Sequence, residues 1–444
     1  MTVALHGRRR DSSTGLRRRE LLKRGGIGLA GIMLPALFGP APVRAAAPQT
    51  VVIWNPDPFD GWLLNIHDTV QTFEKENPGV KVQVVQVPYS DLSTKVVAAH
   101  ATNTLPDIIR TGASDIIDWA SQGILLPVDD VLGKIGKNKF SPNIMNYTVY
   151  QGHPYAVPSV AYPHILFYRK DWYAEAGLKV PTTWDGLLAN CKALHNPGKN
   201  RYGCLVFNKY PDINAVMDLM ATNDASEFDK NGAVTVNSPQ TVEALVMTKQ
   251  LAQLSPPGSA TKSQQDMRIV FAQGIGAHMI TSTSMIDVLA QTPELVDKVS
   301  AFALPVHRGN RGAILGFYGW TITKAPGSRD PAKKFVETWA RPDVALHNAQ
   351  NGVRGYIPID VTVAGDPRYR NAPNIKPFAD YIAAGERVVA TGVLQGERFG
   401  PNSNAGKIQA ARIWTEMMDR VVVEGQDPKA VAAWAEKAIQ DAIR

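Results

Sequence analysis

The sequence has little cysteine and lacks the short motifs that mark many enzymes. Only two cysteines occur in 444 residues, and the nine histidines are scattered along the chain. There is no G-x-S-x-G nucleophile elbow, no phosphate-binding P-loop, no H-E-x-x-H zinc motif and no paired-cysteine motif. No group of His, Cys and carboxylate residues has the spacing of metal ligands. We therefore expect a protein that is not an enzyme, with no catalytic residue, no metal and no cofactor.

The two cysteines, Cys191 and Cys204, allow two interpretations. In an oxidising compartment they can form a disulfide between the helix expected after Trp184 and a strand expected near Val206. Two buried free thiols are the alternative. Sequence spacing does not fix the Cα separation that a disulfide requires, so both interpretations stay open.

No apolar run is long enough to span a bilayer, which takes roughly 20 strongly apolar residues. The run at 25–39 is shorter, rich in glycine and interrupted by Pro35. It follows the twin-arginine pattern RRELLK at 18–23 and precedes a small-residue cleavage site, VRA, at 43–45. Residues 1–45 are thus predicted to be a twin-arginine signal peptide, rather than a basic arm for nucleic acid. The absence of cysteine at its end argues against a lipid anchor, so we expect a periplasmic or extracellular protein.

The basic charge of the chain comes from this leader. The whole sequence holds 47 Lys and Arg against 40 Asp and Glu, a formal charge of +7. Nine of the basic and two of the acidic residues lie in 1–45, which leaves 38 of each in the remainder. A nucleic-acid-binding protein would keep a basic face after processing. We therefore expect no nucleic-acid partner.

Turn and cap residues are concentrated between 152 and 185. They predict a strand ending at Pro158, a strand at 165–168, a short helix closed by Gly177, and a next helix capped by Thr183 or Asp185. The segments read GHPYAVP at 152–158, FYRKD at 167–171 and AGLKVPTTWD at 176–185.

This stretch resembles the crossover region of family 1 extracellular solute-binding proteins, the maltose-binding-protein-like receptors of ABC importers. One departure is Arg169, where the family usually has Asn. Another is His278, where the family usually has Met. The resemblance extends over nearly all of the chain after the leader, through the segments at 73–82, 105–109, 119–125, 271–279, 319–322 and 332–339.

The chain after the leader is too long for one core, so two domains are expected. Apolar runs at 51–54, 80–87 and 107–109 alternate with helical stretches at 64–75 and 94–101, which predicts parallel α/β layers. The resemblance implies a two-lobed α/β periplasmic-binding-protein fold of type II, with discontinuous lobes, crossover strands and a ligand cleft between them. The implied boundaries are 46–160 plus 320–365 for lobe one, and 161–319 plus 366–444 for lobe two.

A receptor for sugars needs aromatic faces for stacking and short polar side chains for hydrogen bonds. In α/β lobes such groups lie at the carboxyl ends of strands. Tyr318 and Trp320 flank Gly319 on one strand, so we expect at most one of them to face a ligand. Hydroxyls at 281–284 follow another strand. The predicted ligand-binding residues are Trp54, Asp57, Ser114, Asp115, Tyr162, His164, Tyr210, Asp212, Ser282, Ser284, Tyr318, Trp320, Arg398 and Asn402.

Together these features predict a non-enzymatic receptor that closes on a carbohydrate (a sugar, oligosaccharide or polyol) and delivers it to the transmembrane subunits of an ABC permease. We expect it to be a monomer that does not span the membrane. The candidate loops are mostly aromatic, amide and hydroxyl, which favours a neutral ligand. Arg398, between Gly396 and Gly400, keeps a glycerophosphodiester or other organophosphate as the alternative.

Overall fold

The computed structural model describes residues 49–327 and 329–444. The predicted signal peptide, residues 1–45, lies outside the described residues. No helix in the described part of the chain is long and apolar enough to cross a membrane.

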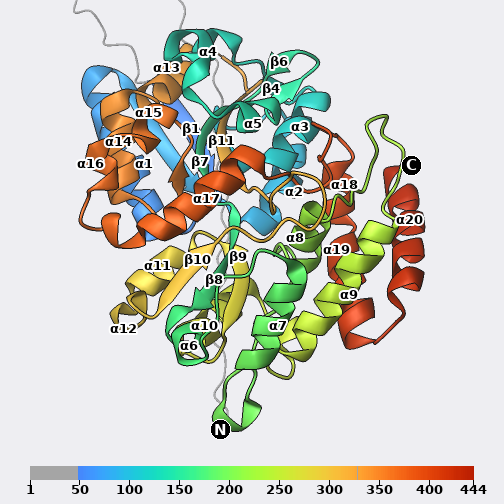
Figure 1. Ribbon diagram of the computed structural model, residues 1–444. Coiled ribbons are helices and arrows are strands. Elements are labelled where there is room, and N and C mark those ends of the chain that lie inside the picture. The colour runs from blue at the N-terminus through green and yellow to red at the C-terminus, as the bar shows by residue number, and fades with distance from the viewer. Residues whose placement is uncertain (1–48, 328) are drawn as a thin grey trace, which may run out of the picture. The chain divides into compact units, whose positions relative to one another are not determined.

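The first sheet has the strand order β12-β7-β11-β3-β1-β2, with β4 paired to β11. The upper half of Figure 1 shows β1, β7 and β11 of this sheet. Its β1 runs parallel to both β2 and β3, whereas β11 runs antiparallel to β3 and β7. The strands are β1 (Gln49–Asn55), β2 (Val80–Gln86), β3 (Ile108–Gly112), β4 (Leu125–Leu126), β7 (Val157–Ala161), β11 (Phe317–Thr323) and β12 (Ile357–Pro358).

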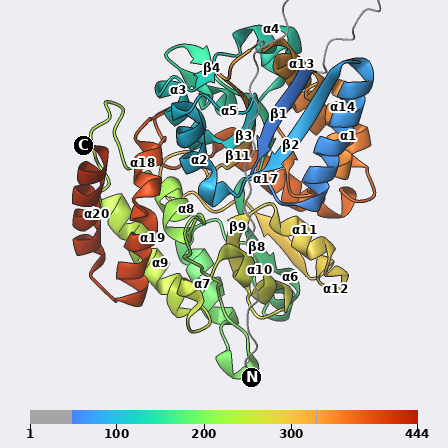
Figure 2. The ribbon, with the colours of Figure 1, turned by 180° about the vertical axis from the view of Figure 1, so that it is seen from behind.

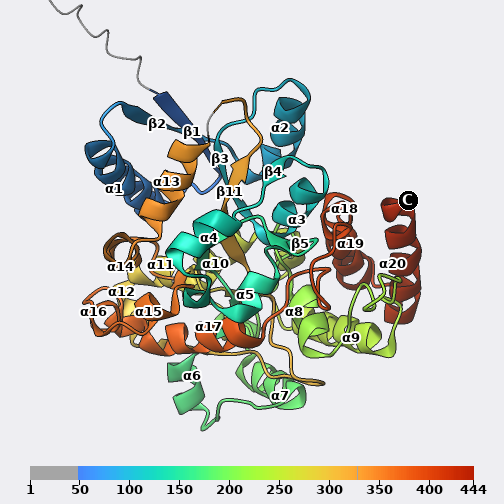
Figure 3. The ribbon, with the colours of Figure 1, turned by 90° about the horizontal axis from the view of Figure 1, so that it is seen from above.

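Helices cover both faces of this sheet. Successive side chains of a strand point to opposite faces, and here both faces are apolar. Ile108 packs with Trp62 and Phe335 under α1 (Asp60–Glu76) and α13 (Asp330–Trp339). Its neighbour Ile109 packs with Leu92 under α2 (Tyr89–Ala101) and α3 (Ala113–Ser121). Figure 3 shows α1 and α13 on one side of the strands and α2 and α3 on the other.

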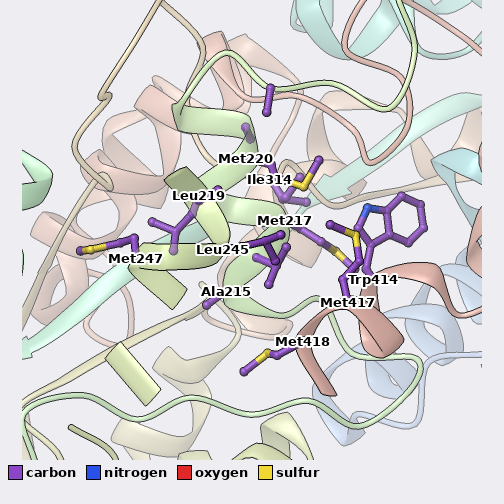
Figure 4. Packing of buried hydrophobic residues seen from close by; sticks show 14 of the residues in the cluster. Ala215, Met217, Leu219, Met220, Leu245, Met247, Ile314, Trp414, Met417 and Met418 are labelled. Atoms are coloured by element: carbon purple, nitrogen blue, oxygen red, sulfur yellow. The ribbon is translucent and has the colours of Figure 1, made fainter. Parts of the chain in front are cut away.

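The second sheet is smaller and antiparallel, with the order β10-β8-β9. It consists of β8 (His164–Arg169), β9 (His278–Ser282) and β10 (Val299–Phe302), with α10 (Gln264–Ala272) and α6 (Lys170–Glu175) beside it (Figure 2). A helical core adjoins the sheet and is built from α8 (Ala215–Thr222), α9 (Pro239–Gln253), α19 (Ile413–Met418) and α20 (Pro428–Ile443). Figure 4 shows Met217 and Met417 beside Trp414 in this core.

The remaining α-helices and strands are short, apart from α7, α14 and α17. They are α4 (Asp129–Ile135), α5 (Pro142–Asn146), α7 (Trp184–Leu194), α11 (Met285–Ala290), α12 (Pro293–Val296), α14 (Pro342–Asn351), α15 (Val361–Ala364), α16 (Pro367–Arg370), α17 (Ala379–Thr391), α18 (Ala405–Ala410), β5 (Val149–Tyr150) and β6 (His153–Pro154).

The chain passes between the two sheets at two places. It leaves the first sheet at the end of β7 and enters the second at β8, with only two residues between the two strands. It returns from β10 to β11, where β11 lies between β3 and β7. The predicted crossover strands are therefore present. The residue limits given for the two lobes remain a prediction.

Two local predictions were wrong. The strand predicted to end at Pro158 instead runs on to Ala161, because Pro158 pairs beside a register shift in β11, where no ladder N–H is needed. Leu205 makes only an isolated bridge to Met279, so no strand forms near Val206. Between α18 and α19 the helix is interrupted at Arg412, which has a left-handed φ of 57°.

Two alternatives left open by the sequence are decided in the structure. Thr183 caps α7, since its hydroxyl accepts the backbone N–H of Gly186 at 3.1 Å. Cys191 and Cys204 are both buried free thiols. Burial raises the pKa of the Cys191 thiol well above its ordinary value, and the adjacent Cys204 raises it further.

Candidate functional site

A cavity of about 250 Å³ lies where the chain crosses between the two sheets. Its lining includes both crossovers, through Tyr162 and His164 on one side and 314–318 on the other. The lining residues are Phe59, Tyr89, Gly112, Ala113, Ser114, Tyr162, His164, Pro211, Asp212, Ile213, Gln264, Arg268, Ser282, Ser284, Ile314, Leu315, Gly316, Phe317, Tyr318, Tyr356, Leu394, Gln395, Ala405 and Gln409.

Four rings form an aromatic wall: Phe59, Tyr162, Tyr318 and Tyr356. The centroids of Tyr162 and Tyr318 are 4.8 Å apart, and those of Tyr162 and Tyr356 are 6.1 Å apart. Phe59 meets Tyr356 edge-on, at an interplanar angle of 88°. Burial raises the pKa of Tyr318 to about 12. This phenol is therefore neutral at physiological pH and able to donate a hydrogen bond.

A buried ion pair supports the aromatic wall from behind. Arg110 Nη1 donates to Asp57 Oδ2 at 3.0 Å, and the two side chains are 0% and 1% exposed. The Arg110 guanidinium lies between the rings of Trp62 and Tyr318, 3.5 and 3.8 Å from their centroids. Tyr356 donates its hydroxyl to the same Asp57 oxygen at 2.6 Å. One ion pair thus fixes two rings of the wall.

The opposite side of the cavity is a polar wall, made of His164, Asp212, Gln264, Arg268, Ser282 and Ser284. His164 Nδ1 lies 2.8 Å from Asp218 Oδ2, and Asp218 Oδ1 accepts the Ile314 N–H at 3.0 Å. Asp212 Oδ2 accepts the Gln264 N–H at 2.7 Å. Burial raises the pKa of Asp212, although this hydrogen bond and the charge of Arg268 oppose the rise. These contacts hold the side chains of His164 and Asp212 in place before any ligand is bound.

Arg268 is the positive charge of the polar wall. It projects from α10, a helix started by a capping box between Ser263 and Asp266. Its Nη2 donates to Ser282 Oγ at 2.7 Å and to Ser284 Oγ at 2.9 Å. Burial lowers the pKa of Arg268 to about 10, so the guanidinium stays charged at neutral pH.

Half of the predicted ligand-binding residues line the cavity, and they come from several separate segments. Tyr318 lines it whereas Trp320, two residues deeper in β11, is fully buried against Trp62. The residues that the structure brings together are Ser114, Tyr162, His164, Asp212, Ser282, Ser284 and Tyr318.

The other predicted ligand-binding residues lie outside the cavity lining, each with its own partners. Trp54 packs in the apolar cluster under α2, and Trp320 in the aromatic core of the first sheet. Asp57 and Asp115 stand behind the wall, where Asp115 accepts from Thr111 and Tyr89 and burial raises its pKa to about 6. The members of this group are Trp54, Asp57, Asp115, Tyr210, Trp320, Arg398 and Asn402.

Three of these side chains belong to the loops around the helical core. Arg398 donates from Nη1 to the Ala221 carbonyl at 3.0 Å and forms an ion pair with Asp224 through Nη2. Tyr210 lies under the guanidinium of Arg412, and Asn402 accepts the N–H of Asn404 to close a turn. Arg398 therefore already has a carboxylate partner and does not meet the cavity.

Residues 56–346 match the model of the bacterial extracellular solute-binding protein family. The chain belongs to this family. A relative, the putative ABC transporter periplasmic-binding protein YcjN of Escherichia coli, is 22% identical over 395 residues, covering 85% of this chain and 89% of the relative. The mannitol-binding protein of Pseudomonas aeruginosa is 23% identical over 309 residues, covering 67% of this chain and 70% of that protein.

A solved structure has the same fold as this solute-binding protein. The ABC transporter solute-binding protein of Agrobacterium radiobacter, in complex with ribitol, has a TM-score of 0.74. It is 23% identical, and the match covers 88% of this chain and 98% of that one. This likeness confirms the predicted two-lobed periplasmic-binding-protein fold.

Sequence reasoning missed several lining residues, above all Arg268, Phe59 and Tyr356. Arg268 lies within an otherwise apolar helix face, since Met267 and Phe271 of the same helix are buried. A cation on an apolar helix face can indicate a functional residue. Arginine in a helix is usually exposed, however, so this signal is easily overlooked. Phe59 and Tyr356 lie in loops, and no local pattern marks them.

Glu397 is a buried acidic residue that follows the lining residues 394–395. Its side chain is 1% exposed, and neither carboxylate oxygen has a hydrogen bond of normal geometry to a described residue. Burial therefore raises the pKa of Glu397 well above its ordinary value, and the Asn402 N–H offsets only part of this rise.

Because this pKa is raised on folding, Glu397 destabilises the protein increasingly as pH rises above about 4.3, the pKa expected when unfolded. Glu397→Gln should thus gain stability relative to the unmodified protein between pH 5 and pH 8, by at most about 1.4 kcal/mol per pH unit. Urea unfolding across this range measures the difference. Parallel pH curves for the two proteins would contradict the prediction.

Proposed function

We propose that this solute-binding protein is the extracytoplasmic receptor of an ABC importer, and that its ligand is a carbohydrate of about monosaccharide size. It captures the ligand without chemical change and passes it to the permease. Export by the twin-arginine pathway to a periplasmic or extracellular location, and a monomeric state, belong to the same proposal.

The observation that carries this proposal is the pairing of an aromatic wall with a polar wall in one cavity. A sugar has C–H faces that stack on rings such as Tyr162 and Tyr318, and hydroxyls that bond to groups such as Asp212 and Gln264. The cavity volume of about 250 Å³ is slightly below the usual range for ligand pockets, roughly 300–1,000 Å³. A single sugar or polyol unit suits it better than an oligosaccharide.

The mechanism follows from the origin of the two walls. The aromatic wall comes from β11 and from loops next to strands of the first sheet, and the polar wall comes from β8, β9, α10 and loops beside the second sheet. A ligand that contacts both walls stabilises the arrangement in which they face one another, and thereby shifts an open–closed equilibrium. The ligands named for relatives, mannitol and maltotriose, support a carbohydrate in this role.

A thermal-shift screen of the exported chain tests the proposal. Neutral monosaccharides, sugar acids, polyols and disaccharides are compared with amino acids at equal concentration. A ligand present at 100 times its Kd should stabilise the protein by about 2.7 kcal/mol, and the radius of gyration in solution scattering should fall at saturation. Stabilisation by amino acids alone would reject a carbohydrate ligand.

Tyr318 and Trp54 form a matched pair for a second test, since only Tyr318 lines the cavity. Tyr318→Ala should weaken binding of the carbohydrate found in the screen by about 1–3 kcal/mol, because an apolar stacking surface is lost. Trp54→Ala should leave the affinity unchanged and lower the free energy of unfolding. Calorimetry and urea unfolding measure the two quantities, and equal losses of affinity would contradict the assignment of the aromatic wall.

A further inference from the structure

Four arginines are buried in the part of the chain that the structure describes: Arg110, Arg169, Arg268 and Arg398. Three of them have a carboxylate partner. Arg110 pairs with Asp57, Arg169 pairs with Asp171, and Arg398 pairs with Asp224. Arg268 differs, since no described carboxylate lies within 4.0 Å of its guanidinium. It is also the buried arginine that lines the cavity.

The contacts of Arg268 hold it in place without neutralising it. Its acceptors within the protein are the hydroxyl oxygens of Thr281, Ser282 and Ser284, all uncharged. Its Nη1 donates to no described residue, and it is not among the polar atoms that are both sealed from solvent and unpartnered. The Nη1 N–H groups therefore have no acceptor among the described residues, and Arg268 lines the cavity in which a ligand can supply one.

Burying a cation without an anion is unfavourable, and proteins usually pair such charges. Asp212 is the carboxylate whose charge acts most on Arg268, but it stands beyond ion-pair distance and accepts the Gln264 N–H. Its charge therefore compensates Arg268 only in part. The ligand is the remaining source of an anion beside Arg268.

We propose that the ligand is a sugar acid, a monosaccharide-sized polyhydroxy compound whose carboxylate bonds to Arg268. This inference rests on the proposed function and specifies the ligand class of the same cavity. The carboxylate accepts N–H bonds from Arg268, and the hydroxyls of the ligand bond to Asp212, Gln264 and His164. The aromatic wall contacts the C–H face of the ring or chain.

Arg268 is the one arginine or lysine among the described residues that line the cavity, which favours a carboxylate ligand over a phosphate. A phosphate carries nearly two negative charges at neutral pH, and here it would face one guanidinium with Asp212 close by. A carboxylate brings one charge, which one guanidinium balances. Sugar phosphates therefore enter the test as a competing outcome.

The test compares ligands that differ in one group. Calorimetry and thermal shift are run on the exported chain with glucuronate, glucuronamide and glucose, with galacturonate and galactose, with gluconate and sorbitol, and with glucose phosphate. We expect at least one carboxylate to bind tenfold or more tightly than its uncharged partner, with affinity falling as salt is raised. A neutral sugar that binds as tightly as its acid, or a phosphate that binds more tightly than any carboxylate, would overturn the inference.

Two variants of Arg268 test whether its charge causes the preference for the acid. Arg268→Met should remove the tenfold preference for the acid, and Arg268→Lys should restore part of it, because the charge returns without the planar fork of N–H groups. Asp212→Asn should raise the ratio of acid affinity to neutral-sugar affinity, because it removes a negative charge near the bound carboxylate, whereas the loss of an acceptor for a ligand hydroxyl weakens both ligands alike.

The outcomes distinguish the general proposal, a carbohydrate receptor, from the more specific one, a sugar-acid ligand. Binding of neutral sugars without binding of any acid rejects the sugar acid and retains the carbohydrate receptor. Binding of no carbohydrate of either kind rejects both. An acid preference that survives in Arg268→Met, in a variant that unfolds cooperatively, rejects the role of Arg268.

Discussion

Replacing Arg110 by methionine is expected to lower the free energy of unfolding by about 3–5 kcal/mol, the usual cost of removing one partner of a buried ion pair. The Asp57 carboxylate, which is 1% exposed, would be left without the guanidinium that donates to it at 3.0 Å. The cation between the rings of Trp62 and Tyr318 would be lost as well. Urea unfolding of the variant and the unmodified protein measures this difference.

An exposed ion pair supplies the control. Arg308 and Glu243 are 48% and 40% exposed, so Arg308→Met should cost about 1 kcal/mol or less. The double variant Asp57→Asn, Arg110→Met should recover part of the loss, because it no longer buries an unpaired charge. If Arg110→Met proved as mild as Arg308→Met, the ion pair behind the aromatic wall would have no structural role.

The elements of the first sheet could be predicted because each has a local pattern. The valines of 80–87 and the pair Ile108 and Ile109 are strand-like and are bounded by turn residues, and all appear in β2 or β3, apart from Val87 just beyond β2. The continuation of β7 past Pro158 and the helix break at Arg412 were not predictable in this way. Each depends on a partner distant in the sequence or on one backbone angle, and a short window contains neither.

The candidate site was predictable only where position along a strand decides the role of a side chain. Tyr318 and Trp320 share one face of β11, and depth alone separates the residue at the cavity from the residue in the core. Arg398 and Arg268 show what sequence reasoning could not predict. Arg398 is neutralised by Asp224, 174 positions away, whereas Arg268 has no such partner among the described residues. The local sequence places Arg268 on an otherwise apolar helix face, but it does not show which of the two arginines lacks a carboxylate partner.

Gly355 is a position where one added methyl group should disturb the fold and the site together. A Cβ there would lie 1.9 Å from the carbonyl oxygen of Thr283 and 2.6 Å from the Cα of Ser284. Both are backbone atoms, so no flexible side chain can move aside. The Gly355 carbonyl also accepts the hydroxyl of Thr283 at 2.6 Å, which ties the two segments together. Gly355→Ala must therefore push them apart.

The expected result for Gly355→Ala is a loss of about 3 kcal/mol of stability, the upper part of the usual range for overpacking. Binding of the carbohydrate should weaken more than tenfold, because Ser284 holds Arg268 on one segment and Tyr356 stands on the other. Gly133→Ala is the control: it lies in α4, nothing is within 4 Å of its added Cβ, and a helical alanine should stabilise by about 0.5–1 kcal/mol. Urea unfolding and calorimetry on both variants decide the matter. If Gly355→Ala kept full affinity and stability, the two segments would not be in the close contact on which the polar and aromatic walls depend.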